Sequence, residues 1–260
     1  QGKYVTEFEN LFAEYCGTKY AIATNSGATS LEVMLRASNI EGKKFLVPTQ
    51  TFVASVSAIV RSNNIPVITD IDPDTQCLNL DIIKANVDED TAGVMLVHMA
   101  GMLPPDYKDI KQYCDDNNLL LVEDASHAVG ATIDGVKAGN LGFAAAFSLF
   151  ATKIITSGEG GMITTNNEGF AERCRVLRNH GCVRNTAIVP GLDYGVSCSV
   201  ASSNYRMPEM SAAIGITQIK RADEFVAKRN LLADRYKERL KDTDIVVPDI
   251  PENITMTWWQ

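Results

Sequence analysis

Short apolar runs alternate along the chain with segments in which apolar residues recur at helical spacing. The apolar runs, which predict buried β-strands, lie at residues 20–24, 45–47, 66–69, 93–98, 119–123, 144–150 and 162–165. The helical periodicity predicts helices at residues 4–15, 29–37, 53–61 and 107–117. This alternation predicts an α/β fold with a mostly parallel sheet and helices on both of its faces. The polar interval 81–90 is expected to lie on the surface.

The pattern changes after Pro208. Apolar residues from 210 to 226 form a helical stripe that continues as one long helix to about Leu240, before two prolines break it. Trp258 and Trp259 follow, and two adjacent tryptophans are unusual on a finished surface. We therefore expect them to begin a further domain that is absent from the chain.

Charge and cysteine usage narrow the class of protein. The formal net charge is -8, and Lys and Arg are dispersed, so no basic stripe for nucleic acid is present. No apolar run approaches the roughly 18 residues needed to cross a bilayer. The six cysteines form no C-x-x-C pair and do not stand at metal-ligand spacing with histidines, which predicts reduced thiols and no metal site. These features favour a cytoplasmic protein without a membrane or nucleic-acid partner.

The residues that are the best candidates for catalysis or binding follow predicted strands. Asp124 ends the run 119–123, His127 comes three residues later, and Lys153 follows the strand at 144–150. The turn Asn25-Ser26-Gly27 joins a strand to a helix, where backbone N–H groups can bind a phosphate. Each signal alone also fits a structural role: an acid that caps a turn, a hydrogen-bonded histidine, a solvated lysine and a plain helix cap.

Taken together, the turn at 25–27, Asp124 and Lys153 match what a pyridoxal-phosphate site needs. Ligands of parallel α/β sheets bind at the carboxyl ends of the strands, so the turn, the carboxylate and the lysine are expected to meet there. The turn would hold the phosphate and Asp124 would pair with the pyridine nitrogen. Lys153 would react with the aldehyde and later move a proton. The combination predicts an enzyme that uses this cofactor.

Several ordered motifs resemble those of the DegT/DnrJ/EryC1/StrS family of sugar aminotransferases. They are Glu123–Ala128, Phe147-Ser148 with Thr152-Lys153, Gly158–Gly161, Leu177–Gly181 and Asn204–Met207. The resemblance spans almost the whole chain and implies the type I fold of pyridoxal-phosphate transferases, a three-layer α/β/α domain. It also implies two regions. Residues 1–222 would form the large cofactor-binding domain, and residues 223–260 a connecting helix and the start of a small C-terminal domain that is largely missing.

The resemblance assigns catalytic roles to three residues. Lys153 would hold the cofactor as a Schiff base and act as general acid and base. Asp124 would bind the pyridine nitrogen. His127 stands where the family usually has Gln or His, near the 3-hydroxyl of the cofactor.

The resemblance also implies five further cofactor contacts, in addition to those of the catalytic residues. Gly27 and Ala28 would offer backbone N–H groups to the phosphate, and Ser148 its hydroxyl. Phe52 matches the segment whose aromatic residue covers one face of the ring. Asn204 matches a residue that reaches the phosphate of a neighbouring subunit, which implies a homodimer with shared active sites.

The implied activity is transfer of an amino group from an amino acid, with glutamate as the expected donor, to a keto sugar that is linked to a nucleotide. Dehydration or other pyridoxal-phosphate chemistry on a sugar or cyclitol is an alternative. Retention of Lys153, which a histidine replaces in the dehydratases of the family, favours transamination. A non-catalytic binding or regulatory protein is a further alternative, against which Lys153, Asp124 and Ser148 argue together.

Two departures from the family pattern concern the phosphate seat and the substrate side. The turn reads Ser-Gly-Ala at 26–28 where the family commonly has Ser-Gly-Thr, so one hydroxyl contact is lost and the backbone contacts are kept. The segment 97–101 lacks the bulky aromatic residue that often precedes its glycine. That residue shapes the substrate side, so the second departure bears on specificity.

Overall fold

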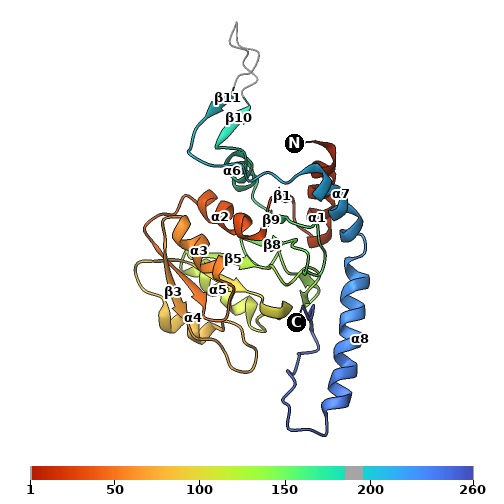
Figure 1. The fold of residues 1–260 in the computed structure, drawn as a ribbon. Helices are drawn as coiled ribbons and strands as arrows, with labels where there is room; N and C mark the ends of the chain where they lie inside the picture. The colour runs from red at the N-terminus through yellow and green to blue at the C-terminus, as the bar shows by residue number, and fades with distance from the viewer. Residues whose placement is uncertain (1, 185–195, 260) are drawn as a thin grey trace, which may run out of the picture.

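The structure is a computed structural model that describes residues 2–184 and 196–259. A seven-stranded sheet lies between two layers of helices (Figure 1). The helices are α1 (Lys3–Cys16), α2 (Gly27–Ala37), α3 (Val53–Arg61), α4 (Leu80–Asn86), the 3-10 turn η1 (Met99–Gly101), α5 (Tyr107–Asp116), α6 (Glu168–Arg178), α7 (Glu209–Ile219) and α8 (Ala222–Leu240). The strands are β1 (Tyr20–Thr24), β2 (Lys44–Pro48), β3 (Ile65–Thr69), β4 (Thr91–Val97), β5 (Leu120–Asp124), β6 (Thr132–Ile133), β7 (Val136–Lys137), β8 (Ala144–Ser148), β9 (Gly161–Thr165), β10 (Cys182–Arg184), β11 (Val196–Cys198) and β12 (Ile254–Thr255).

The main sheet is mostly parallel, which confirms the predicted fold class. Its order is β1-β9-β8-β5-β4-β2-β3, and β8, β5, β4, β2 and β3 pair in parallel. β9 is antiparallel to both of its neighbours, β1 and β8. Because β9 runs opposite to both, β1 has the same direction as β8. The carboxyl ends of β1, β4, β5 and β8 therefore share one edge of the sheet.

The alternation of side chains along the strands separates the two helical layers. On β5, Val122 packs with α2, α3 and α6, whereas Leu121 packs on the opposite face with α4 and α5. On β1, Ile22 likewise faces the α2 layer, and Ala21 and Ala23 face α1, α7 and α8. β1 and β5 thus each have two buried faces, as their continuous apolar sequences predict, whereas the edge strand β3 keeps Ile65 and Ile68 exposed.

Two segments differ in detail from the sequence expectation. The single helix expected from 210 to 240 is two helices, since Arg221 leaves the helical conformation between α7 and α8. This break allows Ile219 and Ala222 both to be buried. The interval 81–90 lies on the surface as expected, with Ile83 as its buried residue, but it also contains most of α4, which Asn79 caps by accepting a hydrogen bond from the Ile82 N–H at 2.9 Å.

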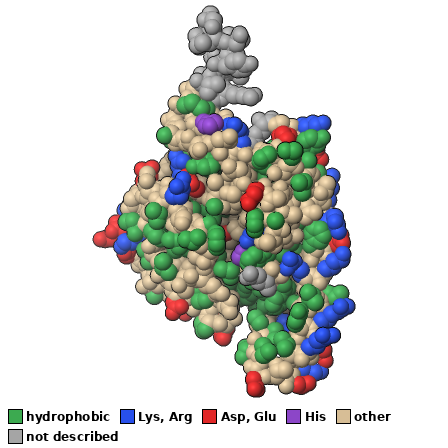
Figure 2. All heavy atoms as spheres, viewed as in Figure 1, with side chains coloured by type: hydrophobic (Ala, Val, Ile, Leu, Met, Phe, Trp, Pro, Cys, Tyr) green, Lys and Arg blue, Asp and Glu red, His purple; other side chains and the backbone are tan. Residues whose placement is uncertain are grey.

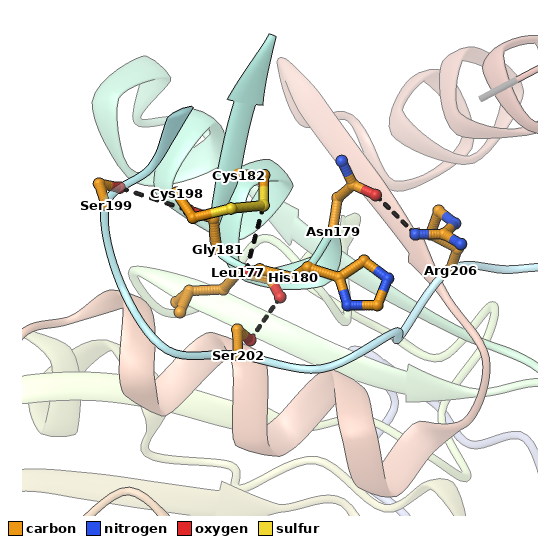
Figure 3. The surroundings of a disulfide bond; sticks show 9 residues. All are labelled: Leu177, Asn179, His180, Gly181, Cys182, Cys198, Ser199, Ser202 and Arg206. Atoms are coloured by element: carbon orange, nitrogen blue, oxygen red, sulfur yellow. Dashed lines mark hydrogen bonds between the residues drawn. A yellow bond between two sulfur atoms is a disulfide. The ribbon is translucent and has the colours of Figure 1, made fainter. Parts of the chain in front are cut away.

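The prediction of six reduced thiols is wrong for one pair. Cys182 and Cys198 form a disulfide, because β10 and β11 pair with these residues directly opposite each other, at a Cα–Cα distance of 4.0 Å (Figure 3). Their separation of 16 residues carries no signal of this pairing in the sequence. The other four cysteines are buried and free.

The surface carries both charges. Figure 2 shows Lys and Arg side chains along the α8 edge, acidic side chains spread over the same face, and hydrophobic side chains over the region of α3. Within residues 2–184 and 196–259, no helix is long and apolar enough to cross a membrane. The same ranges hold no cluster of side chains suited to a metal ion.

Candidate functional site

A cavity of about 550 Å³ opens at the carboxyl edge of the sheet, where the strand-end rule places a ligand. Residues that follow β1, β4, β5 and β8 line it together. Seven of the eight predicted site residues are among them: Gly27, Ala28, Phe52, Asp124, His127, Ser148 and Lys153. The fold thus brings together residues that lie up to 126 positions apart in the sequence.

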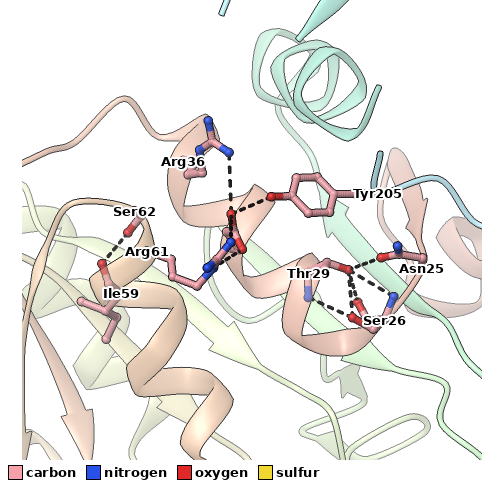
Figure 4. Close-up of polar contacts among 9 residues, drawn as sticks. Asn25, Ser26, Thr29, Arg36, Ile59, Arg61, Ser62 and Tyr205 are labelled. Atoms are coloured by element: carbon pink, nitrogen blue, oxygen red, sulfur yellow. Dashed lines mark hydrogen bonds and ion pairs between the residues drawn. The ribbon is translucent and has the colours of Figure 1, made fainter. Parts of the chain in front are cut away.

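The turn after β1 forms an anion seat at the start of α2. The hydroxyl of Ser26 accepts the Thr29 N–H at 3.2 Å (Figure 4). The Ser26 carbonyl accepts the Ser30 N–H at 3.0 Å. These bonds satisfy the later N–H groups of the first turn and leave those of Gly27 and Ala28 without a partner inside the helix. The positive end of the helix dipole adds to their attraction for a phosphate.

Gly27 allows α2 to approach β8 closely. A Cβ atom at this position would lie 2.6 Å from the Ser148 Cβ and 3.0 Å from its Cα. Only a residue without a side chain therefore brings the Ser148 hydroxyl next to the seat. Gly161 at the start of β9 has the same role behind the turn, because a Cβ there would collide with the carbonyl oxygen of Ser26.

Gly27→Ala is expected to open this seat, because the new methyl group must push α2 away from the backbone of Ser148. We expect phosphate-dependent binding of pyridoxal phosphate to weaken at least about tenfold, and stability to fall by about 1 to 3 kcal/mol. Equilibrium dialysis and thermal unfolding measure the two effects. Gly169→Ala in the first turn of α6 is the matched control, since its Cβ meets neighbours only at 3.6 Å and beyond. Equal affinity of both variants would contradict the seat.

Asp124 is a buried carboxylate with a fixed orientation. It is 5% exposed, and its Oδ2 accepts a hydrogen bond from Ser55 Oγ at 2.6 Å, while its Oδ1 accepts the Ser126 N–H at 3.2 Å. Ser55 is in turn 2.6 Å from the hydroxyl of Thr51, which lines the cavity. Bonds of this kind fix the direction in which the carboxylate oxygens point. Asp124 is therefore suited to pair with a protonated ring nitrogen.

His127 is held as a neutral imidazole. Its Nδ1 accepts the Ala100 N–H at 3.3 Å, which leaves the proton of the neutral ring on Nε2. Burial and, to a lesser extent, the charge of nearby Lys153 lower the pKa of His127 to about 4, against the opposing effect of Asp124. The ring can therefore donate a hydrogen bond from Nε2 at neutral pH without carrying a charge.

Lys153 is half-buried, and its amine lies over an aromatic ring. Its Nζ lies 4.0 Å from the centroid of the Trp259 indole. Burial lowers the pKa of the Lys153 ammonium, and the charge of Asp124 opposes that shift. A lowered pKa makes the neutral, nucleophilic amine easier to reach.

Phe52 and Asn204 have less enclosed positions. Phe52 lines the cavity at the start of α3 but is 68% exposed. Asn204 is exposed and lies outside the cavity, where its side chain accepts the Arg206 N–H at 3.1 Å. In this chain alone, the structure does not bring Asn204 to the other predicted site residues.

The structure adds two residues to the site that motif reasoning missed. Ser55 belongs to the segment that supplied Phe52 and lies in the first turn of α3, where no motif marks it as a contact of Asp124. Trp259 had no local signal, because only the return of the chain to the sheet brings it to the cavity.

The described residues fit pyridoxal phosphate as a cofactor. The cavity combines an anion seat with close backbone approach at Gly27, a fixed carboxylate at Asp124 and a half-buried amine at Lys153. The Ser148 hydroxyl would complete the phosphate contacts, and His127 would face a hydroxyl of the ring. These are the three kinds of group that such a cofactor needs from a protein.

Comparison with known proteins places the chain in a family. The model of the DegT/DnrJ/EryC1/StrS aminotransferase family matches residues 1–260. The chain is 40% identical to GDP-perosamine synthase of Caulobacter vibrioides, over 92% of this chain and 62% of that protein. It is 32% identical to GDP-perosamine synthase of Vibrio cholerae, over 100% of this chain and 68% of that protein.

A solved structure shows the same fold. The aminotransferase from Psychrobacter cryohalolentis superposes with a TM-score of 0.91 at 32% identity, over 99% of this chain and 68% of the other. The chain thus spans about two thirds of the length of the relatives that it matches. With a family match over its full length, the chain belongs to the DegT/DnrJ/EryC1/StrS aminotransferase family.

Proposed function

We propose that this chain carries the cofactor site of an aminotransferase that moves an amino group from an amino acid to a nucleotide-linked keto sugar. The observation that carries the proposal is the meeting of the Lys153 amine, the Asp124 carboxylate and the Gly27 anion seat in one cavity. The names of the two synthases, which begin with GDP, support a nucleotide-linked acceptor. Glutamate is the donor that we propose.

Each residue has a defined task in this proposal. When bound, pyridoxal phosphate supplies an aldehyde that takes up an amino group and a ring that accepts electrons. Gly27, Ala28 and Ser148 would hold its phosphate, and Asp124 would keep the ring nitrogen protonated. His127 Nε2 would donate to the 3-hydroxyl and fix the tilt of the ring.

Lys153 carries the proton-transfer task. Its Nζ would bind the aldehyde carbon in the resting enzyme and, once released, take a proton from one carbon and return it to another. Burial supports this task, because it lowers the pKa of the amine and thereby brings its neutral form closer to neutral pH. The apolar surroundings of the cavity, among them Phe52 and Trp259, would exclude water from this exchange.

We also propose that two copies complete the site. Asn204 is exposed outside its own cavity, so it is free to reach the cavity of a second copy. Phe52 and Val53 are 68% and 64% exposed beside that cavity, and an apolar surface of this kind favours a partner. Because nucleotide-linked sugars and amino acids are cytoplasmic metabolites, we place the reaction in the cytoplasm.

A donor assay tests the activity. The chain is incubated with pyridoxal phosphate, glutamate and a GDP- or dTDP-linked 4-keto sugar, and both 2-oxoglutarate and the sugar product are measured. We expect one 2-oxoglutarate per amino sugar. A dehydrated sugar without stoichiometric donor consumption would favour the elimination chemistry instead. Cofactor binding without turnover of any keto sugar or cyclitol would favour a binding protein.

A further inference from the structure

The segment after α8 is fixed to the body of the protein by a strand pairing and by hydrogen bonds that main-chain carbonyls accept. β12 pairs with β6, and the Thr257 hydroxyl donates to the carbonyl of His127 at 2.6 Å. The main-chain N–H of Trp259 donates to the carbonyl of Ala100 at 3.1 Å. Arg229 of α8 donates to the carbonyl of Trp258 at 2.6 Å. These bonds determine where the side chain of Trp259 enters the cavity.

The indole of Trp259 contacts two of the proposed catalytic residues at once. Its ring stacks on the imidazole of His127, with a centroid distance of 3.7 Å and an interplanar angle of 15°. The Nζ of Lys153 lies over the same indole, 4.0 Å from its centroid. The indole Nε1–H donates to the carbonyl of Thr152 at 2.9 Å, which fixes the ring beside the backbone of Lys153.

We propose that Trp259 is a positioning residue of this site, whose indole orients the imidazole of His127 and holds the ammonium of Lys153 over its face. The inference rests on the proposed function, because the two side chains need defined positions only if a cofactor is received between them. The attraction of a cation to an indole face is the strongest that an aromatic side chain offers. The indole of Trp259 thus couples the orientation of Lys153 to that of His127.

Two influences act on the amine of Lys153: Asp124 at the end of β5 favours its charged form, and burial disfavours it. Glu159 is the other acidic residue among the described residues that line the cavity. Trp259 itself has two effects: its bulk excludes water from the amine, and its π face attracts the ammonium. A leucine in its place keeps much of the bulk and lacks the π face, so it separates the two effects.

The test measures Lys153 in the cofactor-free chain. The rate of its acetylation is followed by peptide mass spectrometry as a function of pH in wild type, Trp259→Leu, Trp259→Phe and Trp258→Leu. We expect the pKa of Lys153 to fall by about half a unit to one unit in Trp259→Leu, and by less in Trp259→Phe, which keeps an aromatic face. Trp258→Leu is the matched control and is expected to leave it unchanged, because Trp258 contacts Asn230 and Lys237 instead.

A second measurement needs no change at Trp259. The chain has three histidines, so its imidazole NMR signals are few, and His127→Gln assigns those of His127. Stacking on an indole is expected to shift them upfield from the ordinary range. Unshifted signals, or a Lys153 pKa that is equal in wild type and Trp259→Leu, would overturn the proposal.

The outcomes also separate this inference from the proposed function. Both measurements are made without cofactor, so they hold even if the chain fails to bind pyridoxal phosphate. If the chain does bind pyridoxal phosphate, Trp259→Leu is expected to weaken that binding about threefold to tenfold. Cofactor bound at Lys153 with the same affinity in Trp259→Leu as in wild type would leave the proposed function intact and overturn the positioning role.

Discussion

Lys153→Ala is expected to abolish covalent attachment of pyridoxal phosphate and to lower the rate of amino transfer at least about 1,000-fold. The variant removes both the nucleophile that binds the aldehyde and the base that moves the proton, and general acid–base catalysis alone contributes about 10² to 10⁴. The remaining groups of the cavity would still hold the cofactor without a covalent bond. Cofactor affinity is therefore expected to fall less than the rate.

The structure explains why no other lysine is expected to substitute for Lys153. Among the described residues, Lys153 is the one lysine that lines the cavity. It follows β8, beside the seat formed by Gly27 and Ser148. Lys137 offers a useful contrast. It is also half-buried, and its Nζ lies 3.4 Å from the centroid of the Tyr15 ring, but it belongs to β7 and pairs with Asp223 outside the cavity.

The measurement is borohydride reduction in the presence of pyridoxal phosphate, followed by peptide mass spectrometry, together with the donor assay. Lys137→Ala is the matched control and is expected to keep labelling and activity. Lys153→Arg keeps the charge, but its guanidinium does not deprotonate, so it is expected to be as inactive as the alanine variant. Labelling at another lysine, or activity in either Lys153 variant, would show that the nucleophile lies elsewhere.

The sheet and most of the cavity could be predicted from the sequence, because both follow from local patterns. Apolar runs such as those of β4, β5 and β8 are buried on both faces, and a parallel sheet requires such burial. Parallel strands place their carboxyl ends at one edge, so Asp124, Lys153 and the turn at Gly27 were expected to meet once the sheet was inferred.

Contacts between distant segments could not be predicted in this way. The pairing of Cys182 with Cys198 depends on the register of β10 and β11, and neither strand is marked by an apolar run. Trp259 reaches His127 because residues 254–259 return to the body after α8, and no periodicity in that segment indicates the return. Such features depend on tertiary packing, on which single-residue patterns carry no information.

The ion pair between the buried Glu32 of α2 and the exposed Arg61 of α3 is a further contact of this kind, and it shows how distant segments support α2. Glu32 accepts hydrogen bonds from Arg61 Nε at 2.7 Å and from the hydroxyl of Tyr205 at 2.8 Å (Figure 4). Arg36 lies 3.6 Å from the same carboxylate. Helix α2, whose N-terminus forms the anion seat, is thus tied both to α3 and to the segment that follows β11.

Glu123, the residue before Asp124 in β5, has a structural role that the sequence did not indicate. Because successive side chains of a strand point to opposite faces, Glu123 faces away from Ser55 and is fully buried. Its carboxylate accepts the N–H groups of Gly139, Leu141 and Gly142 at 2.8 to 2.9 Å. It also lies 3.0 Å from the Nε2 of His98, which is buried at the end of β4.

Glu123→Leu is expected to lower stability by about 3 to 5 kcal/mol, because it leaves three buried N–H groups and His98 without their acceptor. Glu123→Gln keeps one acceptor oxygen and is expected to cost about 1 to 3 kcal/mol. Thermal unfolding measures both, and the leucine variant is expected to lower Tm by about 10 °C.

Asp115→Ala is the control for this second prediction. Asp115 is an exposed acid of α5 that pairs with Lys111 four residues earlier on the same helix, and its loss is expected to cost less than about 1 kcal/mol. A loss in Glu123→Leu no larger than in this control would mean that the loop from Gly139 to Gly142 finds other acceptors. The stability loss is expected to be largest for Glu123→Leu, smaller for Glu123→Gln and smallest for Asp115→Ala. This order follows from the number of buried donors that each change leaves unpaired. Since the same loop leads into β8, the least stable variant is also expected to bind pyridoxal phosphate most weakly.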